Sequence, residues 1–138
     1  MIVGTEWLIE ALECDAEKLR DAAILREIFS RLTEDLNLKT IGEGIWHTFA
    51  GAGGVTGLVA LTESHLACHT YPEYETATFN LYCCRERTEW NWSENLKKTL
   101  GARDVKIRKI ERGVLKENAS DSQSEIINPK SKIVGGKR

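Results

Sequence analysis

The stretch GGVTGLVALTESHLACHTYPEYETATFNLYCC, residues 53–84, decides the fold because it holds two predicted strands around an unusual polar cluster. GGVTGLVAL (53–61) is an apolar run typical of a buried strand, and TATFNLYCC (76–84) is rich in β-forming residues. Between them lie a carboxylate, a hydroxyl, two histidines, a cysteine and a Tyr-Pro-Glu turn. Burying such groups costs free energy unless each finds a partner, so the cluster needs an explanation.

Outside this stretch, the hydrophobic pattern predicts three more strands and two helical regions. The strands are expected at residues 5–11, 45–49 and 104–110, and the helical regions at 15–36 and 94–100, the second capped by Ser93. The order β-α-β-β-β-α-β predicts an α+β fold, a two-layer sandwich with a mainly antiparallel sheet and helices on one face. We expect one domain over residues 1–113 and a polar, mobile tail over 114–138.

Composition narrows the class of protein. A chain of 138 residues suits one domain, and a formal net charge of −2 gives no electrostatic reason to expect nucleic acid or an anionic membrane as a partner. No apolar run approaches the roughly 20 residues that span a bilayer, and no signal peptide is recognisable. We therefore expect a cytoplasmic protein whose four cysteines are reduced thiols.

Three interpretations of the polar cluster are open from the residues alone. A hairpin with a solvated turn accounts for Glu75 but not for the serine and histidines beside a buried run. A zinc site would draw on HLACH (65–69) and on Cys83 and Cys84, but adjacent cysteines on a strand point to opposite faces, so we expect no metal. The third interpretation is nucleophilic chemistry by a hydroxyl, a thiol and a histidine.

The geometry of a hairpin tests this third interpretation. A turn centred on residues 73–74 pairs positions whose numbers sum to about 147, which sets Ser64 opposite residues 82–83. Ser64 and His69 are five residues apart, so a regular strand would place them on opposite faces. A site that joins both side chains therefore requires a bulge or a break at Ser64.

Two short motifs stand in this cluster, Glu63-Ser64-His65-Leu66 and His69-Thr70-Tyr71-Pro72-Glu73. Together they resemble the hallmark of the bacterial and archaeal S-adenosylmethionine decarboxylase proenzymes. The likeness runs from about residue 4 to residue 113. Its further matches are Glu13-Cys14-Asp15, His47, Phe49, the Gly-Val-x-Gly turn at 54–57, Cys84 and Glu111-Arg112-Gly113.

The resemblance implies an enzyme that cuts itself at the Glu63–Ser64 bond. Ser64 Oγ would attack the carbonyl of Glu63, His69 would then remove the Cα proton of residue 64, and chains 1–63 and 64–138 would result. Residue 64 would become a covalent pyruvoyl cofactor, which forms a Schiff base with the substrate and accepts electrons as CO₂ leaves. Cys84 would return a proton to the substrate, and Thr56 would support processing.

The resemblance also implies the substrate and the assembly. S-adenosylmethionine would be converted to the decarboxylated aminopropyl donor for spermidine synthesis, bound by Phe49, Tyr71 and Glu73, in a homodimer with stacked sheets. Glu6 departs from the family pattern, and a carboxylate there suits a guanidinium or ammonium group, so L-arginine or L-ornithine is the alternative substrate. RERTEWNW (85–92) also departs from the usual Asp-Pro-Trp pattern. The non-enzyme alternative is an α+β ligand-binding module.

Overall fold

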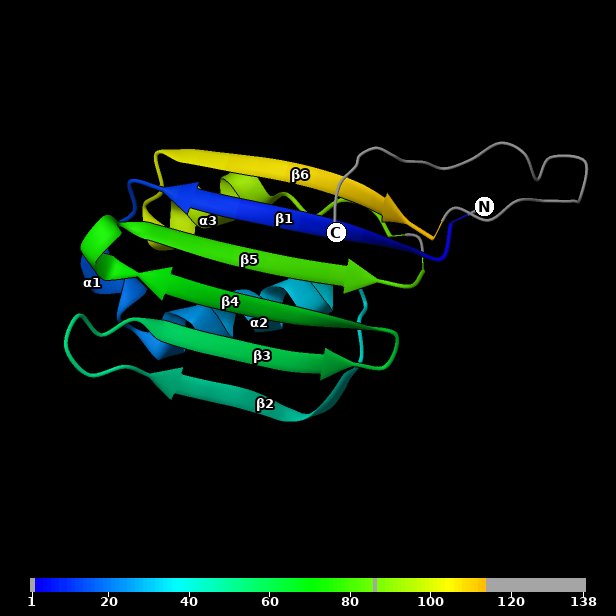
Figure 1. Ribbon diagram of the computed structural model, residues 1–138, viewed down its shortest axis with the longest axis horizontal. Coiled ribbons are helices and arrows are strands. Elements are labelled where there is room, and N and C mark those ends of the chain that lie inside the picture. Colours follow the sequence, from blue (N-terminus) through cyan, green and yellow to red (C-terminus); the bar gives the residue numbers. More distant parts are fainter. Residues whose placement is uncertain (1, 86, 114–138) are drawn as a thin grey trace, which may run out of the picture.

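A computed structural model describes residues 2–85 and 87–113 of the chain (Figure 1). The tail predicted over residues 114–138 lies outside the described part. In chain order the elements are β1 (Gly4–Leu12), α1 (Ala16–Leu19), α2 (Ala22–Asp35), β2 (Thr40–Thr48), β3 (Val55–Leu61), β4 (Ser64–Tyr71), the 3-10 turn η1 (Pro72–Tyr74), β5 (Thr76–Cys83), α3 (Trp92–Leu100) and β6 (Asp104–Arg112).

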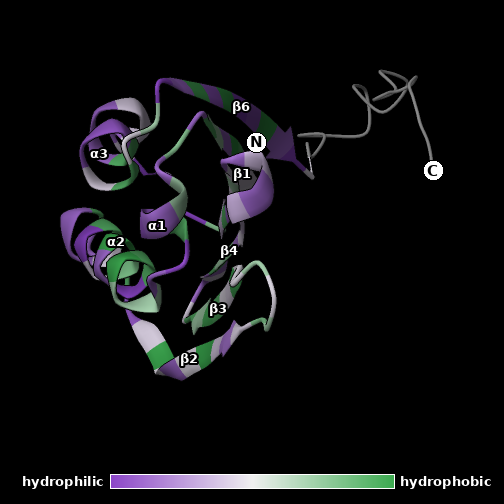
Figure 2. Ribbon diagram, turned by 90° about the vertical axis from the view of Figure 1, so that its left-hand side faces the viewer, coloured by the Kyte–Doolittle hydropathy of each residue, from purple (hydrophilic) through white to green (hydrophobic). Residues whose placement is uncertain are grey.

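The six strands form one antiparallel sheet in the order β2-β3-β4-β5-β1-β6. All three helices lie against one face of this sheet, and the other face is uncovered by the described chain (Figure 2). The predicted α+β class, with two layers and helices on one face, is confirmed. We call the uncovered side the open face.

The predicted element order was wrong at one point, because it left out β4. Residues 64–71 form a regular strand in which Leu66, Cys68 and Thr70 are buried while His65 and His69 are exposed. Polar residues therefore alternate with core residues along one strand. The cluster that interrupted the apolar run is the open-face side of an amphipathic strand.

The predicted helix over residues 15–36 is also two helices. Asp15 caps α1 by accepting from the Glu17 amide at 2.9 Å, and Asp21 caps α2 by accepting from the Ala23 amide at 3.0 Å. Because each of these N-caps starts a helix and they lie six residues apart, the segment forms two helices. In α3, Asn91 and not Ser93 is the cap, since its side chain accepts from the Glu94 amide at 3.1 Å.

The core lies between the sheet and the helices. Alternate residues of the strands point into it and meet the apolar stripes of α2 and α3. Its aromatic part includes Phe29, Phe79 and Trp92, with ring centroids about 6 Å apart in neighbouring pairs. The largest fully buried side chains are Trp7, Trp92, Ile9, Leu19, Leu25, Ile28, Leu32, Leu66, Leu81, Leu96, Leu100 and Val55.

Two core thiols make stability depend on pH. Burial raises the pKa of Cys68 from 9.0 to about 12 and that of Cys14, beside the Glu75 carboxylate, to about 11. Above pH 9 the unfolded chain loses thiol protons that the folded chain keeps, so the folded state then binds more protons. This contribution to stability is present below pH 9 and is lost as pH rises toward the folded pKa.

We predict that the free energy of unfolding falls as pH rises from about 9 toward 11, and falls less steeply in Cys68→Ala. Urea unfolding at a series of pH values measures both slopes. The Ala variant should also be less stable at neutral pH because it leaves a cavity, so the comparison concerns the slopes alone. Identical slopes would show that Cys68 ionises with the same pKa in both states.

Candidate active site

The turn between β3 and β4 carries the Glu63–Ser64 bond. β4 and β5 pair without a shift from Ser64 opposite Cys83 to Tyr71 opposite Thr76, so the predicted hairpin register is confirmed. The amide of Cys84 donates to the carbonyl oxygen of Glu63 at 3.0 Å. The carbonyl that a Ser64 nucleophile must attack is therefore already polarised by a backbone donor.

The two neighbouring cysteines have different surroundings. Cys83 is buried beside Ser64, whereas Cys84 is exposed. Burial raises the pKa of Cys83, although a hydrogen bond from the Ser64 side chain and the positive charge of Arg87 act in the opposite direction. Cys83 is thus a protonated thiol near neutral pH, and Cys84 is the thiol that solvent reaches.

Glu63 itself is paired with cations. Its Oε2 lies 2.6 Å from Arg85 Nε, and its Oε1 lies 3.9 Å from a terminal nitrogen of Arg87. Both arginines follow β5 directly and reach back over the turn that precedes β4. The residue expected on the amino side of the cleavage is therefore held by charge as well as by the Cys84 amide.

His69 lies at the other end of β4. The strand is regular throughout, so the bulge or break that would bring Ser64 and His69 together in one strand is not present. Ser64 faces the helices together with Leu66, and His69 faces the open side about 16 Å further along, at about 3.3 Å per residue. There His69 Nδ1 is 3.0 Å from Thr56 Oγ1, its cross-strand neighbour on β3. Within one chain, Ser64 and His69 do not meet.

Three of the four expected substrate-binding residues, Phe49, Tyr71 and Glu73, lie at the His69 end of the sheet. The ring of Phe49 packs edge-on against His47, with centroids 4.5 Å apart, and the Phe49 amide donates to Gly54 at 2.8 Å. Tyr71 ends β4, and Glu73 follows it in η1. Phe49 is 53% exposed and Tyr71 39%, so both rings offer free surface at this end of the sheet.

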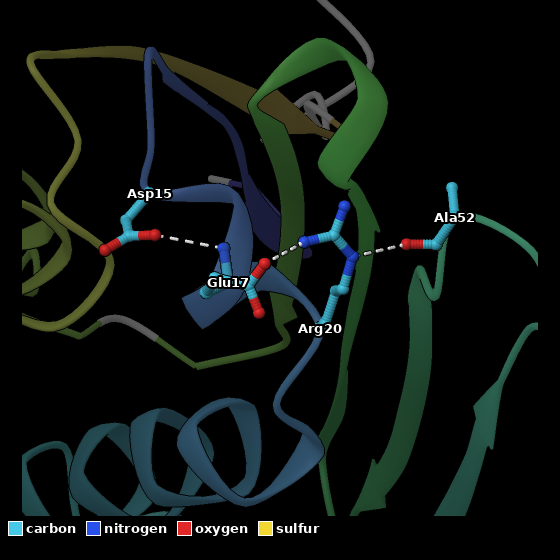
Figure 3. Close-up of polar contacts among 4 residues, drawn as sticks. All are labelled: Asp15, Glu17, Arg20 and Ala52. Carbon is cyan, nitrogen blue, oxygen red and sulfur yellow. Dashed lines mark hydrogen bonds and ion pairs between the residues drawn. The ribbon is translucent and has the colours of Figure 1, made fainter.

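A short chain of hydrogen bonds connects α1 to the loop that follows Phe49 (Figure 3). The Arg20 guanidinium bonds Glu17 at 2.7 Å and donates from Nε to the carbonyl of Ala52 at 2.8 Å. Asp15 caps the same short helix through the Glu17 amide. The β2–β3 loop is thereby tied to α1, which limits how far Phe49 can move.

Glu6 lies on the open face near the Ser64 end and is fully engaged. Asn80 Nδ2 donates to its Oε2 at 2.5 Å, and Arg112 reaches its Oε1 at 3.2 Å. Asn80 also bonds His65 Nε2 at 3.0 Å. The Arg112 guanidinium lies 5.3 Å from the centre of the Tyr82 ring, which stacks on His65. β1 is an interior strand, so Glu6 is not an edge residue.

A hollow of about 420 Å³ opens on the open face between the two ends. Both His65 and His69 line it, with Leu58, Asn80 and Arg108. Among the described residues, no three His, Cys, Asp or Glu side chains are grouped closely enough to hold a metal ion. In the same part of the chain, no helix is long and apolar enough to cross a membrane.

The sequence matches the S-adenosylmethionine decarboxylase family over residues 5–113. The chain belongs to this family. It is 35% identical over 112 residues to the S-adenosylmethionine decarboxylase proenzyme of Thermotoga maritima, which covers 80% of this chain and 85% of the relative. It is 36% identical over 97 residues to the arginine decarboxylase proenzyme of Aeropyrum pernix, covering 70% and 74%.

The fold has a counterpart among solved structures. The adenosylmethionine decarboxylase of Aquifex aeolicus superposes with a TM-score of 0.71 at 24% identity, covering 86% of this chain and 97% of the other. The α+β sandwich is thus the fold of a known member of the S-adenosylmethionine decarboxylase family.

Sequence reasoning missed the partners of Glu6. Asn80 and Tyr82 alternate with the core residues Phe79 and Leu81, so the β5 pattern alone puts them on the open face. That Glu6 lies beside Asn80 depends on the pairing of β1 with β5, across 74 residues of sequence. In this member of the decarboxylase family, the open face therefore carries a polar network around Glu6 that could not be predicted from any local motif.

Proposed function

We propose that the chain is a self-processing, pyruvoyl-dependent decarboxylase that makes its own cofactor at the Glu63–Ser64 bond. The observation that carries the proposal is the hydrogen bond from the Cys84 amide to the Glu63 carbonyl. Attack by Ser64 Oγ turns that carbonyl oxygen into an oxyanion, and a donor already 3.0 Å away stabilises it without reorganisation. Family membership supports the same chemistry, since the matched relatives are decarboxylase proenzymes.

The surroundings of residue 64 fit a reactive carbonyl. Ser64 is half-buried at the start of a strand and borders a cavity of about 310 Å³, so position 64 is not sealed inside the core. A pyruvoyl group there supplies a ketone that binds a substrate amine and accepts electrons as CO₂ leaves. Cys84 is exposed next to this position and can donate a proton to the substrate carbon.

The separation of Ser64 from His69 leads us to propose a two-fold dimer as the working unit. Several large apolar side chains of the open face are exposed, namely Ile41, Ile45, Leu58 and Ile110. An uncovered apolar face of this kind is typical of an interface. In this dimer, the open faces of two copies stack against each other, and the two-fold axis makes their β4 strands run in opposite directions. The Ser64 end of one β4 then lies over the His69 end of the other.

In this arrangement each site takes residues from both copies. One copy supplies Glu63, Ser64 and Cys84, and the other supplies His69 as the base for the Cα proton of residue 64. Thr56 bonds the ring of His69 and holds it in position. The hollow between the two histidines of each sheet then becomes an enclosed space, in which we place the substrate. The reduced thiols suit the cytoplasm as the working compartment.

Self-processing is the first test of this proposal. The wild-type chain should give two fragments on denaturing electrophoresis, corresponding to residues 1–63 and 64–138, and Ser64→Ala should stay whole because it lacks the nucleophile. Intact-mass analysis checks the cleavage point. A wild-type chain that remains whole and has no carbonyl reducible by borohydride would instead favour a non-catalytic ligand-binding module.

Shared sites predict rescue between two inactive chains. His69→Ala alone should not process, because neither copy supplies the base. Co-expressed with Ser64→Ala, however, the His69→Ala chain should be cut, since its Ser64 meets His69 of the second copy. Tags of different length on the two chains identify which one is cleaved. Absence of cleavage in the mixed dimer would place the whole site within one chain.

For the substrate, we propose S-adenosylmethionine. Two exposed rings and the carboxylate of Glu73 lie at one end of the sheet, where they suit adenine, a sulfonium cation and ribose hydroxyls. Glu6 supports a basic amino acid less well, because Asn80 and Arg112 already occupy both of its oxygens. Because one relative is an arginine decarboxylase proenzyme, L-arginine remains the alternative substrate, together with L-ornithine.

Release of CO₂ from S-adenosylmethionine, L-arginine and L-ornithine, measured side by side, decides between these substrates. We expect turnover of S-adenosylmethionine, and a change in kcat/KM of no more than about threefold in Glu6→Gln, because Asn80 and Arg112 engage Glu6 and leave it no role in binding this substrate. Turnover of arginine or ornithine alone that collapses in Glu6→Gln would reverse the assignment.

A further inference from the structure

A basic cavity opens beside the bond that processing would break. Its volume is about 310 Å³, and both Glu63 and Ser64 border it. Lys39, Arg85 and Arg87 also line it. Lys39 comes from the segment between α2 and β2, and its carbonyl accepts from the Thr62 amide at 2.9 Å, which holds that segment against the turn.

The charges of this cavity do not balance. Among its described lining residues, three cations face one acid, Glu63, which leaves a local net charge of +2 (three positive, one negative). Arg85 is 68% exposed, and the Arg87 side chain, at 24%, is more enclosed. Exposed ion pairs contribute little to folding stability, so stability alone does not account for the pairing of Arg85 with Glu63.

Processing creates a new anion at this place. After Ser64 Oγ has taken over the acyl group, Glu63 is joined to residue 64 through an ester. Removal of the Cα proton by a base forms a Cα=Cβ double bond, and the Cβ–O bond breaks with its electron pair going to Glu63. The leaving group is therefore the main-chain carboxylate of Glu63, in a position where a neutral carbonyl stood before.

We propose that Lys39, Arg85 and Arg87 form a carboxylate-binding pocket for the chain end that processing makes at Glu63. The pocket holds both carboxylates of the terminal glutamate, and its charge stabilises the main-chain carboxylate as it departs in the elimination step. Counted over the described lining residues, the new anion lowers the local net charge from +2 to +1, which remains positive. This inference rests on the proposed self-processing, which it deepens.

Three observations support this role. The Glu63 side chain already bonds Arg85 and approaches Arg87, so the residue that becomes the chain end is docked before the reaction. The Cys84 amide holds the carbonyl oxygen that becomes part of the carboxylate. The cavity borders the breaking bond itself, and charge-assisted hydrogen bonds are the stronger kind when a group becomes ionic.

The test follows processing in time, in a cell-free translation that is pulsed with labelled amino acid and then chased. The double variant Arg85→Ala/Arg87→Ala should release its two fragments about tenfold more slowly, the kinetic equivalent of one charge-assisted hydrogen bond. The uncut chain should accumulate as the ester, which hydroxylamine cleaves between residues 63 and 64. Arg85→Lys/Arg87→Lys keeps the charge and should recover most of the rate.

Arg31→Ala is the matched control, because Arg31 is an exposed arginine of α2 that pairs with Glu27 at 3.7 Å. It should process at the wild-type rate. If the double Ala variant matches it and shows no ester, the pocket has no part in elimination and the inference fails while self-processing stands. Slow processing without ester would overturn it too, since the defect would then precede elimination. A wild-type chain that never cuts itself refutes the proposed function instead.

A second measurement examines the finished protein. Carboxypeptidase should remove Glu63 from the cleaved double variant faster than from cleaved Arg31→Ala, because the pocket no longer shields the chain end. Equal rates of removal would contradict the holding role even if the elimination step is slowed.

Discussion

The geometry of the site depends on one constraint, the period of two along a strand that has a core on one face only. Helices cover one side of the sheet, so every second residue of β4 faces the core and the others face the open side. Leu66, Cys68 and Thr70 face the core, and His65 and His69 face the open side. Because Ser64 and His69 differ by an odd number of residues, this period places their side chains on opposite faces of the sheet, and five residues of strand separate them along it.

The fold was predictable where local patterns are decisive. A turn centred on residues 73–74 and the runs on either side of it were enough to predict that Ser64 lies opposite residues 82–83, and its partner is Cys83. β4 was left out of the predicted element order because its polar residues were treated as a cluster between two strands, although residues 64–71 already served as one arm of the predicted hairpin. The split between α1 and α2 was missed for another reason: Asp15 was expected to open a single helical region that runs through Leu36, and Asp21 was not recognised as a second N-cap.

Only the part of the site that lies within short sequence motifs, or within one hairpin, was predictable. Glu63 and Cys84 are adjacent because they lie at the open end of the β4–β5 hairpin, and the pairing within a hairpin follows from counting residues outward from its turn. The hydrogen bonds of Glu6 span 74 and 106 residues and depend on the order in which strands enter the sheet. That order is a property of the whole core. In the sequence, Arg85 and Arg87 were noted only because the segment 85–92 departs from the family's usual Asp-Pro-Trp pattern. In the structure, both arginines pair with Glu63.

The same strand order explains how the proposed cleavage can leave the fold intact. A cut at residues 63–64 divides the sheet into β1, β2 and β3 on one fragment and β4, β5 and β6 on the other. In space these strands interleave, because β3 pairs with β4, and β1 lies between β5 and β6. Three complete ladders therefore join the fragments, and the core packs both of them against the same helices. Separation would require unfolding, so a chain with this topology can break its own backbone and still hold the new end in place.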